Sequence, residues 1–102
     1  MFKGAANRDD NEPLFTELLD RYRVEYSKGK PGDGYDLLVQ IHPMEFWEIK
    51  NPGAGKWKLT KAEKKKQAYC KAAEIPYRVL EYTDQAADVL GEYFSKMKGT
   101  DE

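Results

Sequence analysis

Two short apolar segments near the middle of the chain constrain its fold more than any other feature. They span residues 35–41 and 45–50, and only three residues separate them. Both are rich in β-forming residues and are bounded by Gly and Pro, which predicts a hairpin of two strands. Beyond Glu45, which begins the second segment, three charged residues interrupt these segments: Asp36, Glu48 and Lys50. Charges within apolar strands are costly unless they pair or bind a ligand, so these residues are the first candidates for a functional site.

Strand geometry divides the second segment into two faces. Because successive side chains of a strand point to opposite sides, Glu48 and Lys50 share one face while Trp47 and Ile49 share the other. Asp36 begins the partner strand. The simplest alternative to a functional site is that Glu48 and Lys50 only pair with each other on an exposed sheet face.

Length and composition exclude several classes of protein. With 102 residues, of which 40% are hydrophobic, the chain is expected to form one small domain. A single Cys70 excludes an internal disulfide and a Cys-rich zinc site, and a single His42 excludes a site built on several histidines. His42 is interpreted as a solvated turn residue rather than a catalytic base. The chain has no apolar run of the roughly 20 residues that span a bilayer and no signal pattern, so a cytoplasmic location is expected.

Charge is distributed unevenly. Residues 56–71 contain seven lysines and one glutamate, a local charge of +6 in a chain whose net charge is −1. A basic segment on a mildly acidic protein predicts a polyanionic partner. The alternative is a solvated, lysine-rich helix face.

The pattern along the chain predicts one α/β domain over residues 11–95, with flexible ends at 1–10 and 96–102. Helices are predicted over residues 11–22, from 61 onward behind a Thr60–Glu63 capping box, and from 83 or 84 onward. Strands are predicted over 23–27, in the hairpin and over 76–82. A helix between the third and fourth strands would join parallel strands, with helices covering both faces of the sheet.

Helical spacing assigns a buried face to each helix. The predicted apolar stripes are Leu14, Phe15, Leu18, Leu19 and Tyr22; Ala62, Lys66, Tyr69 and Ala73; and Ala87, Leu90, Gly91 and Phe94. Lys66 is the unusual member, which either extends from the packed face to solvent or reaches toward the charged hairpin. Glu12 is placed at the edge of the first buried face, although an acid at a helix N-terminus is also favoured by the helix dipole alone.

The chain resembles a family of nucleases at several places. Asp36 followed by Glu48-Ile49-Lys50 on the next strand is similar to the Asp…(Asp/Glu)-x-Lys signature of restriction-endonuclease-like enzymes. Roughly residues 8–92 resemble the virus-type replication-repair nuclease (VRR-Nuc) domain through Asn11-Glu12-Pro13, residues 32–39, Trp47 to Pro52, and the Leu59-Thr60-x-x-Glu63 opening of the second predicted helix. In two places the chain departs from the family pattern, with Tyr35 where Pro is usual and Glu63 where Gln is common.

This resemblance implies a restriction-endonuclease-like αβββαβ core, a small mixed sheet flanked by helices, and an extra C-terminal helix. It implies a metal-dependent DNA endonuclease using Mg²⁺ or Mn²⁺, with Asp36, Glu48 and Lys50 as catalytic residues. A hard divalent cation takes oxygen ligands, and those expected are Asp36, Glu48, the Ile49 carbonyl and Glu12 through water. The DNA-binding residues expected are Lys28, Lys30, Lys56, Lys58, Lys61, Lys64, Lys65 and Lys66.

Other functions and assemblies stay open from the sequence. The chain is alternatively a nucleic-acid-binding module with little or no turnover, acting within a replication or repair complex, or a small interaction protein that presents Phe46, Trp47 and Trp57. For the nuclease, branched DNA such as a four-way junction is the expected substrate. A homodimer would match the two-fold symmetry of such a junction. Its interface is sought around Phe46, Trp57, Tyr93 and Phe94.

Overall fold

The computed structural model describes residues 3–41, 43–54 and 57–101, so the expectations for His42 and Lys56 lie outside the described residues. The helices and strands follow the predicted order. They are α1 (Lys3–Arg21), β1 (Tyr26–Lys28), β2 (Leu37–Val39), β3 (Glu45–Ile49), the short 3-10 helix η1 (Pro52–Ala54), α2 (Lys61–Ala73), β4 (Tyr77–Leu80) and α3 (Thr83–Asp101).

The four strands form one mixed sheet in the order β1-β2-β3-β4. The first three strands are antiparallel neighbours, and Leu37 of β2 lies opposite Trp47 of β3. β3 and β4 are parallel, with Glu48 opposite Val79, and α2 provides the crossover between them. The predicted hairpin and the predicted parallel crossover are therefore both confirmed.

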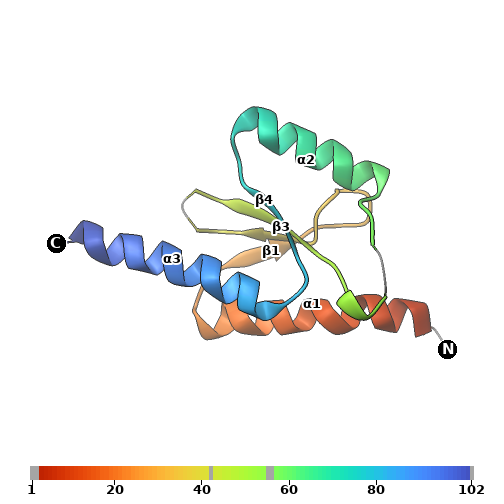
Figure 1. Cartoon of the computed structure of the whole chain (residues 1–102), viewed down its shortest axis with the longest axis horizontal. Coiled ribbons are helices and arrows are strands. Elements are labelled where there is room, and N and C mark those ends of the chain that lie inside the picture. The colour runs from red at the N-terminus through yellow and green to blue at the C-terminus, as the bar shows by residue number, and fades with distance from the viewer. Residues whose placement is uncertain (1–2, 42, 55–56, 102) are drawn as a thin grey trace.

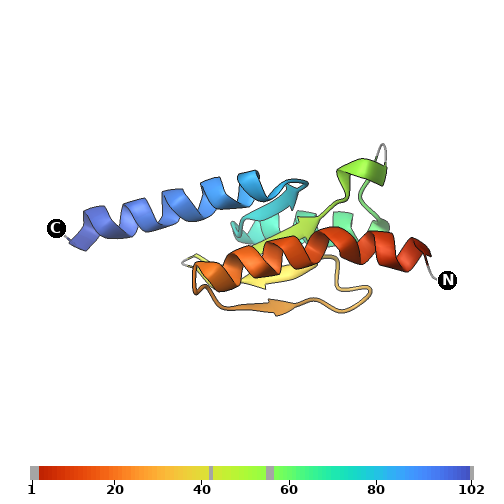
Figure 2. The same ribbon diagram turned by 90° about the horizontal axis from the view of Figure 1, so that it is seen from below.

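Helices cover both faces of this sheet (Figure 1). α1 and α3 lie together on one face, while α2 lies alone on the other. The view from below places α1 and α3 in front of the strands and α2 behind them (Figure 2). The molecule thus has three layers, with a small mixed sheet in the middle.

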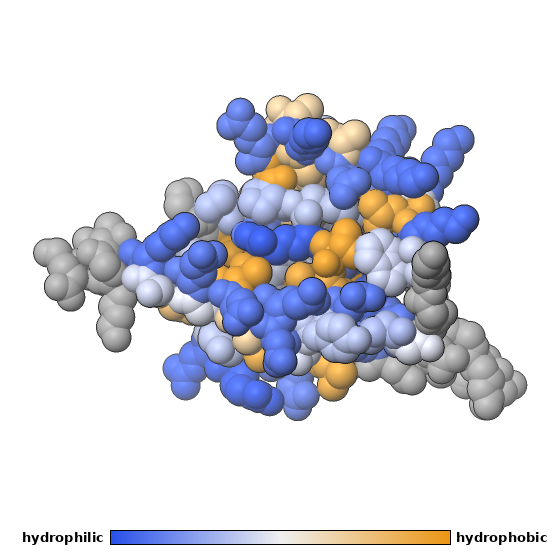
Figure 3. Space-filling view, viewed as in Figure 1, coloured by the Kyte–Doolittle hydropathy of each residue, from blue (hydrophilic) through white to orange (hydrophobic). Residues whose placement is uncertain are grey.

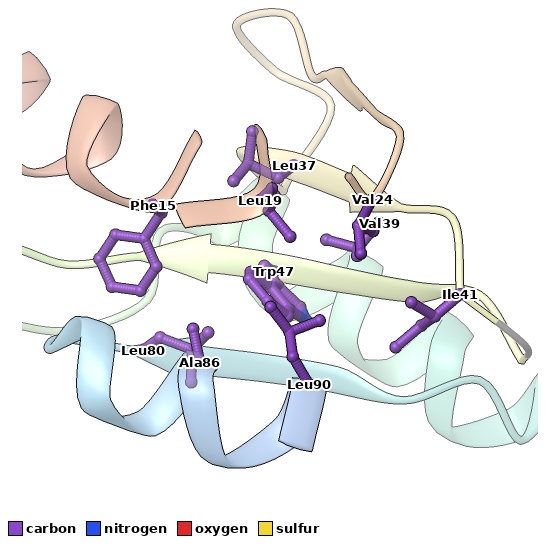
Figure 4. Packing of buried hydrophobic residues seen from close by; sticks show 10 residues of the cluster. All are labelled: Phe15, Leu19, Val24, Leu37, Val39, Ile41, Trp47, Leu80, Ala86 and Leu90. Atoms are coloured by element: carbon purple, nitrogen blue, oxygen red, sulfur yellow. The ribbon is translucent and has the colours of Figure 1, made fainter. Parts of the chain in front are cut away.

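The apolar core fills the space between the sheet and the α1–α3 layer. Trp47 lies at its centre, between side chains of β2 and those of α3 (Figure 4). The other buried members are Phe15, Leu19, Val24, Leu37, Val39, Ile41, Leu80, Ala86 and Leu90. Trp47 also donates its indole N–H to Glu45 Oε1 at 3.0 Å, and Arg78 pairs with the same carboxylate at 2.6 Å. This pairing satisfies the buried polar groups at the edge of the core.

The structure corrects the predicted start of the first helix. α1 begins at Lys3 rather than near Asn11, so Pro13 lies inside it. The prediction placed Pro13 in the first turn because proline has no N–H to donate within a helix. Helices extend into both ranges that were expected to be flexible, because α1 begins at Lys3 and α3 ends at Asp101. The flexibility of residues 1–10 and 96–102 stays a prediction.

All three predicted buried faces were also wrong in part. On α1 Phe15 and Leu19 are buried, whereas Leu14 and, just after the helix, Tyr22 of the predicted stripe are exposed. On α3 the buried residues are Ala86 and Leu90, with Val89 and Tyr93 packed beside them, whereas Phe94 is exposed. On α2 only Cys70 is buried, and Tyr69 of the predicted stripe is exposed. In α2 and α3, the contacts with the sheet select a face close to the apolar stripe but rotated from it. None of the described helices has the length and apolar character needed to cross a membrane.

Candidate active site

The alternation of β3 brings the predicted catalytic residues to the face of the sheet that α2 covers. Trp47 and Ile49 turn toward the core, as predicted, so Glu48 and Lys50 turn the other way. Asp36 immediately precedes β2 and donates its backbone N–H to the Trp47 carbonyl at 2.9 Å. Its Oδ2 accepts the Ile49 N–H at 2.7 Å. The hairpin register therefore fixes the Asp36 carboxylate beside β3.

Lys50 lies between two carboxylates. Its Nζ is 3.3 Å from Glu48 Oε2 and 2.9 Å from Glu63 Oε1. Burial lowers the pKa of this ammonium, but Glu63 and Glu48 raise it by more, so the pKa of Lys50 lies above its ordinary value. Lys50 is consequently a positive charge and a proton donor at neutral pH, which fits a role in neutralising a phosphate better than a role as a base.

Glu48 is a buried acid in an unusual electrostatic setting. It is only 4% exposed, and burial is the main reason that its pKa is raised to about 8. A hydrogen bond with Glu63 and the charges of Asp36 and Glu63 raise the pKa further, against the opposing effect of Lys50. Without a bound cation, Glu48 therefore holds a proton at neutral pH.

Glu63 belongs to this cluster, although the sequence reasoning assigned it only to the helix cap. The capping box is confirmed, with Glu63 Oε1 accepting the Thr60 N–H at 2.8 Å. The same oxygen accepts a hydrogen bond from Lys50. Burial raises the pKa of Glu63, but hydrogen bonds from Thr60, Glu48 and Lys50 lower it by more. The available signal in the sequence was an acid placed shortly after the charged hairpin, because an acid adds charge that the cap itself does not need.

A groove of about 610 Å³ opens over these residues. One rim is the glycine-containing loop from Gly29 to Tyr35, and the other is formed by Asn51, Trp57 and Thr60. Gly34 has a φ of +86°, and a Cβ there would lie 2.4 Å from the Ala62 carbonyl oxygen. Glycine is therefore required for this loop to pass so close to the start of α2.

Asn11 and Glu12 connect α1 to the groove. Glu12 lines it, and its Oε2 is 3.9 Å from Lys28 Nζ, a weak ion pair. Asn11 donates its side-chain amide to the Lys50 carbonyl at 2.7 Å and to the Glu81 carbonyl at 3.1 Å. Sequence reasoning did not identify Asn11 individually. Its hydrogen bonds fix α1 against the ends of β3 and β4, where the candidate site lies.

The predicted DNA-binding lysines occupy different surroundings. Lys30 lines the groove, and hydrophilic side chains project around α2 in the space-filling view (Figure 3). Among these expected residues, those exposed to solvent are Lys28, Lys30, Lys58, Lys61, Lys64 and Lys65. Lys66 differs, because its Nζ lies 5.1 Å to 5.6 Å from the ring centroids of Tyr35, Phe46 and Tyr69. The ammonium is thus placed against aromatic rings of the hairpin and of α2.

The acids of the groove are the candidate ligands for a metal ion. Within residues 3–41, 43–54 and 57–101, no three His, Cys, Asp or Glu side chains are arranged to hold one. Mg²⁺ commonly binds through only one or two carboxylates and keeps its other ligands as water. Lys50 pairs with Glu48 and Glu63, and the charge of Asp36 acts on Glu48, so the three ionised acids exceed the one lysine by two negative charges. Asp36 and Glu48 could therefore act as the two carboxylate ligands of a divalent cation, although their side chains are not already arranged around a metal position.

Comparison with known proteins found no matching family model, no matching curated protein and no matching solved structure.

Proposed function

We propose that this chain is a metal-dependent DNA endonuclease similar to the VRR-Nuc domain. The observation that carries the proposal is the joint placement of Asp36, Glu48 and Lys50 along one groove. Two acids and a lysine with these contacts supply what phosphodiester hydrolysis needs from side chains. The antiparallel β1-β2-β3 unit followed by a parallel β4 supports a restriction-endonuclease-like arrangement.

Each residue has a distinct role in this proposal. Asp36 and Glu48 would hold Mg²⁺ or Mn²⁺, with the Ile49 carbonyl as a further oxygen ligand and Glu12 acting through water. A cation held there would neutralise phosphate charge and activate water. Lys50, kept charged by Glu48 and Glu63, stabilises the negative charge that develops on the phosphate and orients the attacking water. Glu63 positions Lys50 and keeps it protonated.

The lysines of α2 and of the groove rims would hold the DNA backbone. Phosphate contacts of this kind carry no sequence information, so the proposal includes no base-specific readout. The proposed substrate is branched DNA rather than a simple linear duplex. Two copies of the chain related by a two-fold axis would present two sites to a four-way junction.

A surface formed by α1 and α3 supports the proposed homodimer. Phe94 is exposed and stacks on Tyr22, with 6.1 Å between their ring centroids. Of the other aromatic candidates, Phe46 packs against Tyr35 within the chain and Tyr93 packs on the core. Sedimentation at micromolar concentration tests the assembly, and a strict monomer that still cuts junctions symmetrically would contradict it.

Cleavage of supercoiled plasmid tests the proposed activity. With Mg²⁺ or Mn²⁺ the purified protein should produce nicked or linear DNA, and a chelator should prevent this. Asp36→Asn and Glu48→Gln should each abolish cleavage while keeping the fold, because each removes a ligand charge without changing shape. Glu17→Gln, at an exposed position of α1, is the matched control.

Two results would contradict the proposal in different ways. Full metal-dependent cleavage by both site variants would show that the hydrolysis comes from another site or a contaminant. DNA binding by the wild-type protein without any cleavage would instead support the binding-module alternative.

A further inference from the structure

Trp57 is an exposed aromatic residue on the rim of the groove. The chain has two tryptophans: Trp47 is completely buried, whereas Trp57 is 39% exposed. Trp57 lines the groove together with Lys50 and Glu63. An exposed indole beside a cluster of charges has no role in the apolar core on the opposite face of the sheet.

Contacts from two strand ends hold the indole in place. Its Nε1–H donates to Glu81 Oε2 at 2.7 Å, immediately after β4. Lys50 Nζ, immediately after β3, lies 6.0 Å from the ring centroid, at the outer limit of a cation–π contact. The single polar group of the ring is therefore satisfied, and what the ring still offers is a flat apolar surface. Such a surface suits a planar aromatic ligand.

Basic residues lie next to this ring along the chain. Lys58 follows it directly and is exposed, and exposed Lys61 begins α2 shortly afterward. An aromatic ring bordered by lysines is the arrangement that binds unpaired nucleic acid, with the ring stacking on bases and the lysines following phosphates. Bases inside a duplex are already stacked on one another, so they reach a side chain only after leaving the stack.

We propose that Trp57 stacks on an unpaired base next to the phosphate held in the groove. The substrate is then a DNA strand that is locally single-stranded, such as the unpaired nucleotides at a branch point or a flap. This inference rests on the proposed nuclease function and narrows its substrate class.

Intrinsic fluorescence provides a direct test of stacking. Trp47 is shielded from ligands by the core, so a change in emission caused by an oligonucleotide reports on Trp57. The experiment uses the cleavage-inactive Asp36→Asn variant in chelator, with a thymidine 12-mer and a 12-base-pair duplex as probes. The single strand should quench emission on binding, and the duplex should quench it much less. The additional variant Trp57→Phe should lose the quenching, since Trp47 alone remains.

Affinity measurements then separate stacking from a general loss of structure. Trp57→Ala should weaken binding of the thymidine 12-mer at least about fivefold, the lower end of what one stacked base contributes. Binding of the duplex should change less than about twofold, because phosphate contacts dominate there. Trp57→Phe should restore most of the single-strand affinity, since phenylalanine also stacks. The unchanged emission of Trp47 checks that each variant is folded.

Several outcomes would overturn the inference. These are saturation by the thymidine 12-mer without quenching, an equal loss of affinity for both probes in Trp57→Ala, and no binding of either probe. If Trp57 instead contacts a protein partner, Trp57→Ala would leave the affinities for both probes unchanged, and this result would also overturn the inference. Failure of hydrolysis is a separate result, because stacking is measured without turnover: a wild-type protein that quenches selectively but never cleaves would contradict only the proposed nuclease function.

Discussion

Trp47 and Glu48 are adjacent on β3, yet one lies in an apolar core and the other in a cluster of charges. On the side of Trp47, α1 and α3 seal the sheet with aliphatic and aromatic side chains. On the side of Glu48, α2 buries only Cys70 and leaves a groove lined by acids, lysines and glycines. The same strand thus serves two environments with opposite requirements.

The comparison shows how a small domain separates stability from chemistry. The core face excludes water, so its contribution to the free energy of folding comes from apolar burial. The α2 face brings the charges of Asp36 and Glu63 close to Glu48, with Lys50 as the cation that pairs with Glu48 and Glu63, and this crowding of acids costs folding free energy. Among the residues that the structure describes, the apolar cluster around Trp47 lies on the face away from the groove.

The largest expected effect is the loss of stability caused by a substitution in the apolar core. Trp47→Ala should lower the free energy of unfolding by about 3–5 kcal/mol, because it leaves a large cavity among fully buried neighbours. Tyr69→Ala on α2, where the side chain is 58% exposed, should change it by less than about 0.5 kcal/mol. Urea denaturation followed by circular dichroism measures both. Equal losses would mean that α2 packs as tightly as the other layer.

Sequence patterns predicted the parts of the site that depend on local geometry. The alternation of residues 45–50 separates Trp47 from Glu48 without reference to any other segment. The capping box likewise follows from the spacing of Thr60 and Glu63 alone. The hairpin and the parallel crossover follow from the order of the elements.

The rest depends on contacts between distant segments. The Lys50–Glu63 ion pair joins the end of β3 to the first turn of α2, and the strand and helix patterns contain no information about that distance. Asn11 reaches two carbonyls that lie far away in the chain. The buried face of α3 is Ala86 and Leu90 because of how the helix docks, which the helical period alone leaves undetermined.

The second prediction concerns the lysine of the charged face. Lys50→Ala should reduce kcat at least about a hundredfold, the scale on which removing one group that stabilises transition-state charge lowers a rate, while the fold is retained. Lys58→Ala is the matched control, since Lys50 contacts only the backbone carbonyl of that residue. It should raise KM for DNA and leave kcat nearly unchanged. Plasmid cleavage at several DNA concentrations separates the two, and a loss below tenfold for Lys50→Ala would assign this residue a structural role.

The third prediction tests the electrostatic cost on the Glu48 side. The pKa of Glu48 is about 8 in the folded chain against an ordinary value of 4.5. The folded protein therefore binds a proton that the unfolded chain releases between these values. This stabilisation is complete below the ordinary pKa and is lost as the pH rises through the folded pKa.

The unfolding free energy of the wild-type protein in chelator should thus fall by on the order of 2 kcal/mol between about pH 6 and about pH 9. Glu48→Gln should remove most of this fall and should be the more stable protein at the higher pH. Glu17→Gln should keep it. A pH dependence that is identical in wild type and Glu48→Gln would show that Glu48 titrates normally.

The smallest expected effect lies on the outer surface of α2, away from both the core and the acids. Charge reversal at Lys61, Lys64 and Lys65 should weaken DNA binding for all sequences and reduce the salt slope of log K by up to about 2.7, since each lost phosphate contact removes about 0.9. Folding should be unaffected or slightly favoured, because Lys61 begins α2 and an acid there suits the positive end of the helix dipole. Lys71→Glu, in the last turn, is the control and should leave the slope nearly unchanged. An unchanged slope in the triple variant would place the phosphate contacts elsewhere, with Lys28, Lys30, Lys56 and Lys58 as the next residues to reverse.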